Sequence, residues 1–217
     1  MLEEANYIFN YLPTRFKSIL EDEYQKYLWS SFQALCERDK TQAPSFSIVP
    51  FHMLVLLSIH YKILRIAKAK PEHYPLAYTF NNIVRGDQER LKNPTSPFDV
   101  SKLAERSTFD ILQFVNADSA LIQQAKQLVD RRNELAHVTG AIELDAGSKI
   151  DTYLELLQAL QAYFTDINDI IANDWLAEIA PEDDKDTFVD TRLAESYLCP
   201  ADFRDGLLLE HFPRDSE

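Results

Sequence analysis

PFHMLVLLSIHYKILRIAKAK, residues 50–70, is the stretch of sequence that decides the fold. Its apolar positions recur on nearly every side of a helical wheel, a pattern typical of a helix that other helices cover on all sides. Pro50 suits the first turn of that helix, and Pro71 ends it. The stretch therefore predicts a central, buried helix.

Three-and-four spacing of apolar residues predicts further helices around this one. They cover residues 15–39, 74–84, 100–115, 119–136 and 149–175. The loop composition of residues 92–97 separates two of them. The chain has only 4 glycines, fewer than the turns of a sandwich, barrel or doubly wound sheet normally need. We expect an all-α fold, an antiparallel helical bundle over residues 1–180 with an acidic tail, residues 181–217, that docks on a partner or on the chain itself.

Charge and composition limit the function classes. The net charge is -13, from 35 acidic and 22 basic residues, which argues against broad, sequence-independent binding to a nucleic-acid backbone. A small basic site within an acidic surface remains compatible with this charge. Cys36 and Cys199 lie far apart, and no His or Cys spacing suits a metal. No glycine-rich phosphate loop is present either, so we expect neither a metal nor a cofactor.

The sequence also predicts a location. Its first residues, MLEE, are acidic where a signal peptide is basic. The most apolar run, residues 48–59, is too short to span a bilayer and contains His52. We expect a cytoplasmic protein without a membrane segment.

The segment that most suggests a chemical function is RNELAH, residues 132–137, at the end of the helix predicted over residues 119–136. Asp118 or Ser119 caps the start of this helix, and Gly140 supplies a stop after it. On a wheel of about 100° per residue, Arg132 lies in the middle of the apolar face. That face is formed by Leu121, Ala125, Leu128, Val129 and Ala136.

A guanidinium in an apolar stripe requires compensation, because Arg cannot deprotonate. Its partner is either a carboxylate from a neighbouring helix, for which Glu21, Asp22 or Glu23 are candidates, or a bound anion such as phosphate. His137 by itself suits a helix-end cap, where a donor or cation meets exposed carbonyls.

The residues Arg132, Asn133 and His137 resemble the signature of the HEPN superfamily, in which Arg is followed by a polar residue, often Asn, and after four to six residues by His. The resemblance covers about residues 15–178 and implies metal-independent RNA cleavage, with two motifs lining a shared cleft in a homodimer. It implies that His137 transfers protons, Arg132 stabilises the phosphate charge, and Asn133 orients the phosphate or His137. Arg131 and Lys126 are candidate contacts to the RNA substrate.

The family includes toxins and phage-defence effectors, so a neutralising or regulatory protein partner is also expected. In one toxin branch a modifiable Tyr stands two residues after the His, whereas this chain has Thr139 there. Two other interpretations remain open. One is a non-catalytic HEPN-like module that dimerises and binds RNA, nucleotide or protein, and the other is a helical adaptor in which Arg132 forms a structural ion pair.

Helical geometry sets a condition for catalysis. On a continuous helix, Arg132 and His137 differ by about 140° in direction and about 7.5 Å in rise. They can act on one phosphate only if the helix ends before His137 or if two chains combine their motifs.

Overall fold

A computed structural model of the chain describes residues 2–38, 45–79, 91–137, 145–179 and 196–202. These parts contain helices and no strand, which confirms the all-α prediction. The α-helices are α1 (Leu2–Ala5), α2 (Ile19–Arg38), α3 (Ile48–Ala69), α4 (Tyr74–Thr79), α6 (Pro97–Val100), α7 (Glu105–Asp110), α8 (Ser119–Ala136), α9 (Ala146–Gln161) and α10 (Thr165–Ile179). Short 3-10 helices are η1 (Asn6–Tyr11), η2 (Ser45–Ser47), η3 (Ile111–Val115), η4 (Ala162–Phe164) and η5 (Pro200–Asp202).

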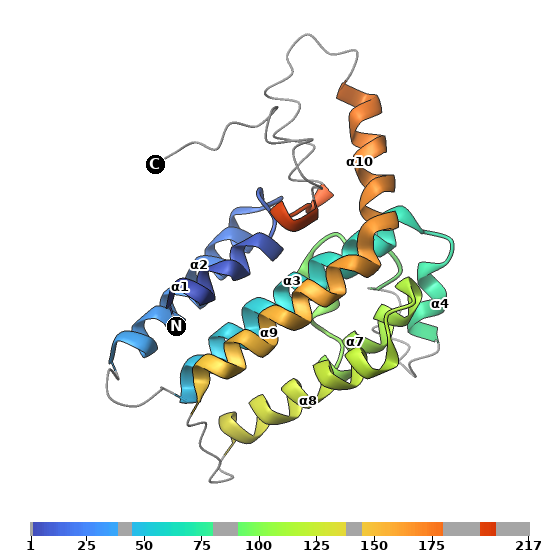
Figure 1. The fold of residues 1–217 in the computed structure, drawn as a ribbon. Helices are drawn as coiled ribbons and strands as arrows, with labels where there is room; N and C mark the ends of the chain where they lie inside the picture. The colour runs from blue at the N-terminus through green and yellow to red at the C-terminus, as the bar shows by residue number, and fades with distance from the viewer. Residues whose placement is uncertain (1, 39–44, 80–90, 138–144, 180–195, 203–217) are drawn as a thin grey trace.

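Helix α3 forms the axis of the molecule, as its sequence predicts (Figure 1). It packs against α2, α6, α8, α9 and α10. By length and apolarity alone α3 could cross a membrane, but 83% of its most apolar window is buried inside the bundle. Burial of this many aliphatic side chains is the main source of stability that the sequence offers.

The helices around α3 run in two directions. Helix α2 is antiparallel to α3, since Phe32 meets Phe51 near one end and Phe16 meets Tyr61 nearer the other. Helix α9 is parallel to α3: the chain passes along α8 to the end of the bundle where α3 begins, and α9 starts there (Figure 1). The expected antiparallel arrangement thus holds for α2 but not for α9.

Two predicted helices are interrupted. The helix expected over residues 100–115 instead starts at Pro97, where the Ser96 side chain accepts from the Phe98 amide and Asp99 completes a capping box. Ala104 then has extended backbone (ψ 133°), so the chain restarts as α7 and ends as η3. The helix expected over residues 149–175 is divided at η4 into α9 and α10. Parts of the predicted helices near residues 39 and 80–84, and Gly140, lie outside the described residues.

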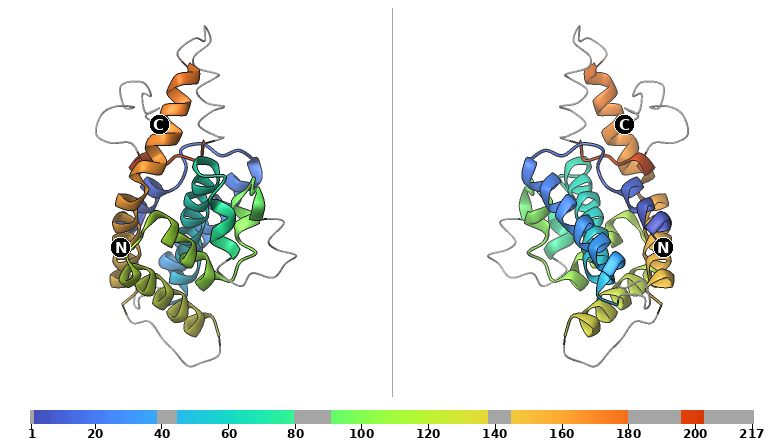
Figure 2. Two further views of the ribbon diagram at one scale, coloured as in Figure 1. Left: turned by 90° about the vertical axis from the view of Figure 1, so that its right-hand side faces the viewer. Right: turned by 90° about the vertical axis from the view of Figure 1, so that its left-hand side faces the viewer.

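Residues 196–202 pack against the helical body, and Tyr197, Leu198 and Cys199 are buried there. The Thr14 amide donates to the Leu198 carbonyl at 3.1 Å, and the ring centroids of Tyr197 and Tyr61 are 5.0 Å apart. Figure 2 shows this segment, in red, beside the N-terminal helices and α10. The segment therefore closes the end of the bundle opposite the start of α3.

Charged side chains anchor the segment. Lys62 and Arg65, both on α3, are 0% and 1% exposed, and Arg65 pairs with Asp202, whose side chain is 1% exposed. The Asp202 carboxylate also accepts from the Gln161 and Asn168 side chains, at 2.6 and 2.9 Å. Lys62 Nζ lies 3.9 Å from the same carboxylate. Two buried cations thus depend on one carboxylate supplied by the segment 196–202.

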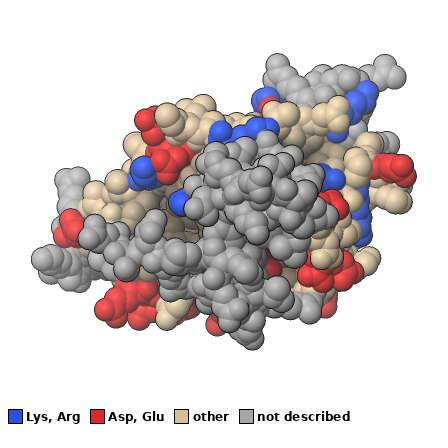
Figure 3. All heavy atoms as spheres, turned by 90° about the horizontal axis from the view of Figure 1, so that it is seen from above, with Lys and Arg blue, Asp and Glu red and all other residues tan. Residues whose placement is uncertain are grey.

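The surface that the structure describes carries both signs of charge. Figure 3, which views the molecule from above, shows Lys and Arg side chains among separate acidic patches on that face. A local concentration of positive charge can therefore exist despite the net charge of -13.

Candidate functional site

Helix α8 carries the RNELAH motif and begins as the sequence predicts. The Asp118 side chain accepts from the Ala120 amide at 2.7 Å and so caps the helix. The face toward the core comprises Ile122, Ala125, Leu128, Val129 and Leu135. Ala136, which the wheel placed on this face, is exposed at the end of the helix, where no described residue covers it.

The helix ends at Ala136, and His137 is its C-terminal cap with extended backbone (φ −103°, ψ 163°). The His137 amide still donates to the Asn133 carbonyl at 3.0 Å, while the side chain is exposed. The sequence-based condition that the helix must end before His137 is therefore met. The path of the chain after His137 lies outside the described residues.

Arg132 points inward, and its side chain is 15% exposed. Its partner is Glu105 on α7, to which a terminal guanidinium nitrogen donates. The three expected partners were wrong: Glu21 instead accepts from Tyr197 and from the Lys17 amide, both at 3.1 Å. The sequence could not identify Glu105 because α7 meets α8 only after the unpredicted break at Ala104.

A second layer of polar side chains holds Glu105. His52 is 1% exposed, and its Nε2 lies 3.4 Å from the Glu105 carboxylate. Its Nδ1 lies 2.8 Å from the Tyr153 hydroxyl. A carboxylate can only accept, so Nε2 carries the proton and Nδ1 accepts from Tyr153. These contacts give both ring nitrogens of the buried His52 a partner.

The same surroundings keep His52 neutral. Burial lowers the pKa of His52 to about 3, and the positive charge of Arg132 contributes to the shift. Burial also raises the pKa of Tyr153 above its usual range. His52 and Tyr153 therefore act as fixed hydrogen-bonding groups that orient Glu105, and through it Arg132.

One donor of Arg132 lacks a partner. Its Nε is buried, and no described residue accepts from it. An unsatisfied buried donor is costly, and such atoms merit a functional or structural reason. The guanidinium is thus only partly satisfied by Glu105.

The two predicted substrate contacts are already paired. Arg131 donates to Glu134 at 2.8 Å, and Lys126 donates to Asp110 on α7. Arg106 on α7 pairs with Asp130 as well. Every Lys and Arg on α7 and α8, as the structure describes them, therefore has a carboxylate partner.

The described residues hold no group of His, Cys, Asp and Glu side chains that could bind a metal ion. Cys36 and Cys199 are both free and buried. No family model, curated protein or solved structure matches this chain.

Proposed function

We propose that the chain is a metal-independent RNA endonuclease of the HEPN type, in which His137 transfers protons and Arg132 stabilises charge on the phosphate. The observation that carries this proposal is the end of α8. The helix stops at Ala136, so the exposed His137 leaves the helical path about one and a half turns after a guanidinium that Glu105 holds in place.

The chemistry uses these groups in a simple way. The 2′-oxygen of a ribose attacks the adjacent phosphorus, and the bond from phosphorus to the 5′-oxygen breaks. A base removes the 2′ proton and an acid protonates the leaving oxygen, and an imidazole can do either near neutral pH. A guanidinium held in position stabilises the negative charge that develops on the phosphate oxygens. Asn133, half-buried beside Arg132, orients the phosphate or His137.

A homodimer fits this chemistry because one reaction uses both an acid and a base, and each motif supplies one imidazole. Two copies that bring their α8 ends together provide two imidazoles and two guanidinium groups. Phe46 supports such a contact: it is 62% exposed on η2, which packs against α8. A protein partner that covers this end would block the cleft.

The ion pairs on α7 and α8 favour a second candidate, the non-catalytic module. Glu105 neutralises Arg132, and acids neutralise Arg131 and Lys126 as well. A phosphate at Arg132 would have to approach a carboxylate, which opposes binding. In this alternative the end of α8 is an interface between copies or with a protein.

The experiment that tests the proposal incubates purified protein with end-labelled RNA in EDTA. Fragments that end in 2′,3′-cyclic phosphate are expected, and His137→Ala should lower the rate at least about 100-fold. His73→Ala is the matched control, because His73 is exposed in the turn before α4. Cleavage that requires Mg²⁺, or that survives His137→Ala, would refute the proposal.

A mixing experiment tests the shared cleft. Arg132→Ala and His137→Ala proteins are each expected to be inactive, whereas mixed dimers regain part of the activity if the two chains combine their motifs. If folded dimers form but neither the wild type nor the mixture cuts RNA, the non-catalytic module is the correct interpretation. Analytical ultracentrifugation of Phe46→Ser reports on the interface separately.

A further inference from the structure

A hollow in the surface lies near the C-terminal end of α3, away from the RNELAH motif. Its volume is about 350 Å³, within the usual range for small-molecule sites. Lys17, Lys68, Lys92, Thr95, Ser196 and Tyr197 line it with polar atoms, and Leu64, Ala67, Pro71 and Pro94 add apolar walls. On α3, Lys68 is about 24 Å from His52, so this pocket and the RNELAH motif are separate places.

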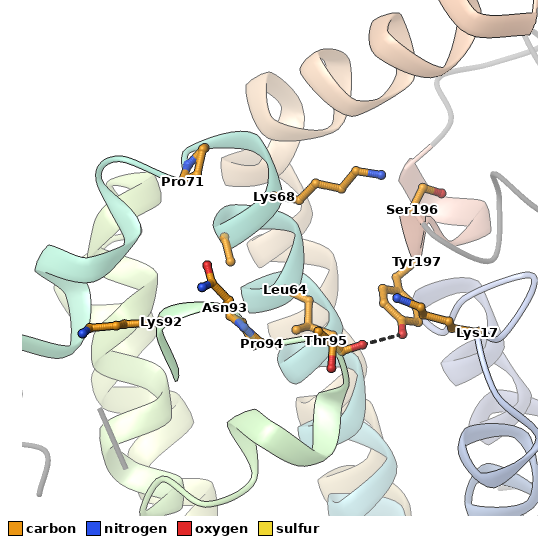
Figure 4. Close-up of a pocket in the computed structure, with 11 residues that line it drawn as sticks. Lys17, Leu64, Lys68, Pro71, Lys92, Asn93, Pro94, Thr95, Ser196 and Tyr197 are labelled. Atoms are coloured by element: carbon orange, nitrogen blue, oxygen red, sulfur yellow. Dashed lines mark hydrogen bonds between the residues drawn. The ribbon is translucent and has the colours of Figure 1, made fainter. Parts of the chain in front are cut away.

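We propose that this pocket binds the phosphate group of a small phosphorylated molecule. Three lysines come to it from separate parts of the chain: Lys17 precedes α2, Lys68 is on α3, and Lys92 lies just before the loop to α6. In Figure 4, Lys68 extends toward Ser196 and Lys17 lies beside Tyr197, whereas the Lys92 side chain lies at the opposite edge and points away from the other two lysines.

The charge of the lining is unusual for this protein. The chain has 35 acidic and 22 basic residues, yet the described residues that line the pocket include three lysines and no Asp or Glu. No described residue forms a hydrogen bond or ion pair with the ammonium group of Lys17 or Lys68. The ammonium groups of Lys17 and Lys68 border one hollow and repel each other, and an anion between them removes that repulsion.

The Glu21 carboxylate contacts two lining residues but does not itself line the pocket. Glu21 is 2% exposed, and its oxygens accept from the Tyr197 hydroxyl and the Lys17 amide, both at 3.1 Å. It thus positions the backbone of Lys17 and the ring of Tyr197. Asp99 is likewise occupied by Thr95, Ser96 and Lys102.

The docked segment 196–202 builds one wall. Tyr197 has a left-handed backbone (φ 55°), a conformation that costs a non-glycine residue free energy and persists only where contacts enforce it. Its hydroxyl donates to Glu21 and lies 3.2 Å from the Thr95 carbonyl, which ties the segment to the loop before α6. The pocket is therefore complete only when the segment is in place.

The size and lining select the ligand class. We expect a mono- or diphosphate to contact Lys17 and Lys68, with Thr95 and Ser196 as hydrogen-bonding groups. The apolar walls suit a compact organic portion. An extended RNA backbone is a poorer fit, because its affinity comes from many phosphate contacts along an open basic surface.

Isothermal titration calorimetry with pyrophosphate and with adenosine 5′-monophosphate, in about 50 mM salt, tests the proposal. We expect saturable binding that weakens about tenfold in Lys68→Ala and in Lys17→Ala and that is largely kept in Lys68→Arg. Lys26→Ala and Lys102→Ala are matched controls, because these lysines pair with Asp22 and Asp99 outside the pocket. The two ligands together distinguish recognition of phosphate alone from recognition of the organic portion.

Several results would overturn the inference. These are the absence of binding at millimolar ligand, equal binding in Lys17→Ala and Lys68→Ala, or an RNA oligonucleotide that binds through Lys68 while pyrophosphate does not. His137→Ala should bind pyrophosphate normally, so failure of the ribonuclease proposal and failure of this one are distinguishable. Circular dichroism of each variant establishes that it is folded.

Discussion

Replacing Asp202 with Asn tests the buried charge cluster that holds the segment 196–202 against α3. The change keeps the size of the side chain but removes its negative charge. Lys62 and Arg65 then remain buried without a carboxylate. In addition, the Asn amide hydrogens face groups that donate to Asp202 in the wild type, such as the Gln161 and Asn168 side chains. We expect the segment 196–202 to lose most of its attachment.

The magnitude follows from two considerations. The positive charges of Arg65 and Lys62 outweigh the opposing effect of burial and lower the pKa of Asp202 from 3.8 to about 2. Ionised Asp202 therefore contributes about 2 kcal/mol that is present above pH 3.8 and is lost as the pH falls through 2. Removing one partner of a buried ion pair costs more, about 3–5 kcal/mol, because the remaining charges stay in a medium of low polarity. We expect the larger value, because a protonated carboxyl has one O–H, which either oxygen can carry, whereas the Asn amide places two N–H donors where other groups donate to Asp202.

Urea denaturation measures the global effect, and amide exchange at Leu198 and Cys199 measures local detachment. Asp169→Asn is the matched control, because Asp169 is exposed on α10 and its substitution should change stability by less than about 0.5 kcal/mol. Lys62→Met should cost less than Asp202→Asn, since it leaves a one-to-one pair of Arg65 and Asp202. If Asp202→Asn matches the control in both measurements, the cluster does not hold the segment and the reasoning is wrong.

Two other predictions follow from buried groups. Burial lowers the pKa of His52 to about 3 and the pKa of His60 to about 4, whereas both residues have a pKa of 6.5 in the unfolded chain. The free energy of unfolding is therefore highest above pH 6.5 and decreases as the pH falls below it, because the unfolded chain then binds protons that the folded protein does not. Urea titrations should show a loss of about 3 kcal/mol between pH 7.5 and 5.5, with about half of it absent in His60→Leu, and a flat profile would contradict this. Glu105→Gln should lower the free energy of unfolding by about 1–2 kcal/mol, because it weakens the bond to the 15%-exposed Arg132. Asp130→Asn removes a pair that is about half exposed and should cost less than about 0.5 kcal/mol in the same assay, so equal effects would show that burial is unimportant here.

The sequence alone was sufficient for the features that depend on neighbouring residues. The all-round apolar pattern of residues 50–70 predicted the central helix, and the structure confirms it as α3. The sequence offered Asp118 or Ser119 as the cap of this helix, and Asp118 caps α8; the helix was expected to end near Ala136, and it ends there. Periodicity, capping and the intolerance of helices for proline act within a few residues, so they are readable along the chain.

Only the tertiary structure decided which charges meet. Arg132 needed a carboxylate, and that requirement could be derived from the sequence, but the identity of Glu105 depends on a break at Ala104 that no local pattern marked. The pairing of Arg65 with Asp202 joins residues 137 positions apart. A buried charge is unfavourable unless a group of opposite charge or a hydrogen-bonding group pairs with it, and the folded path of the chain determines which such group is close enough.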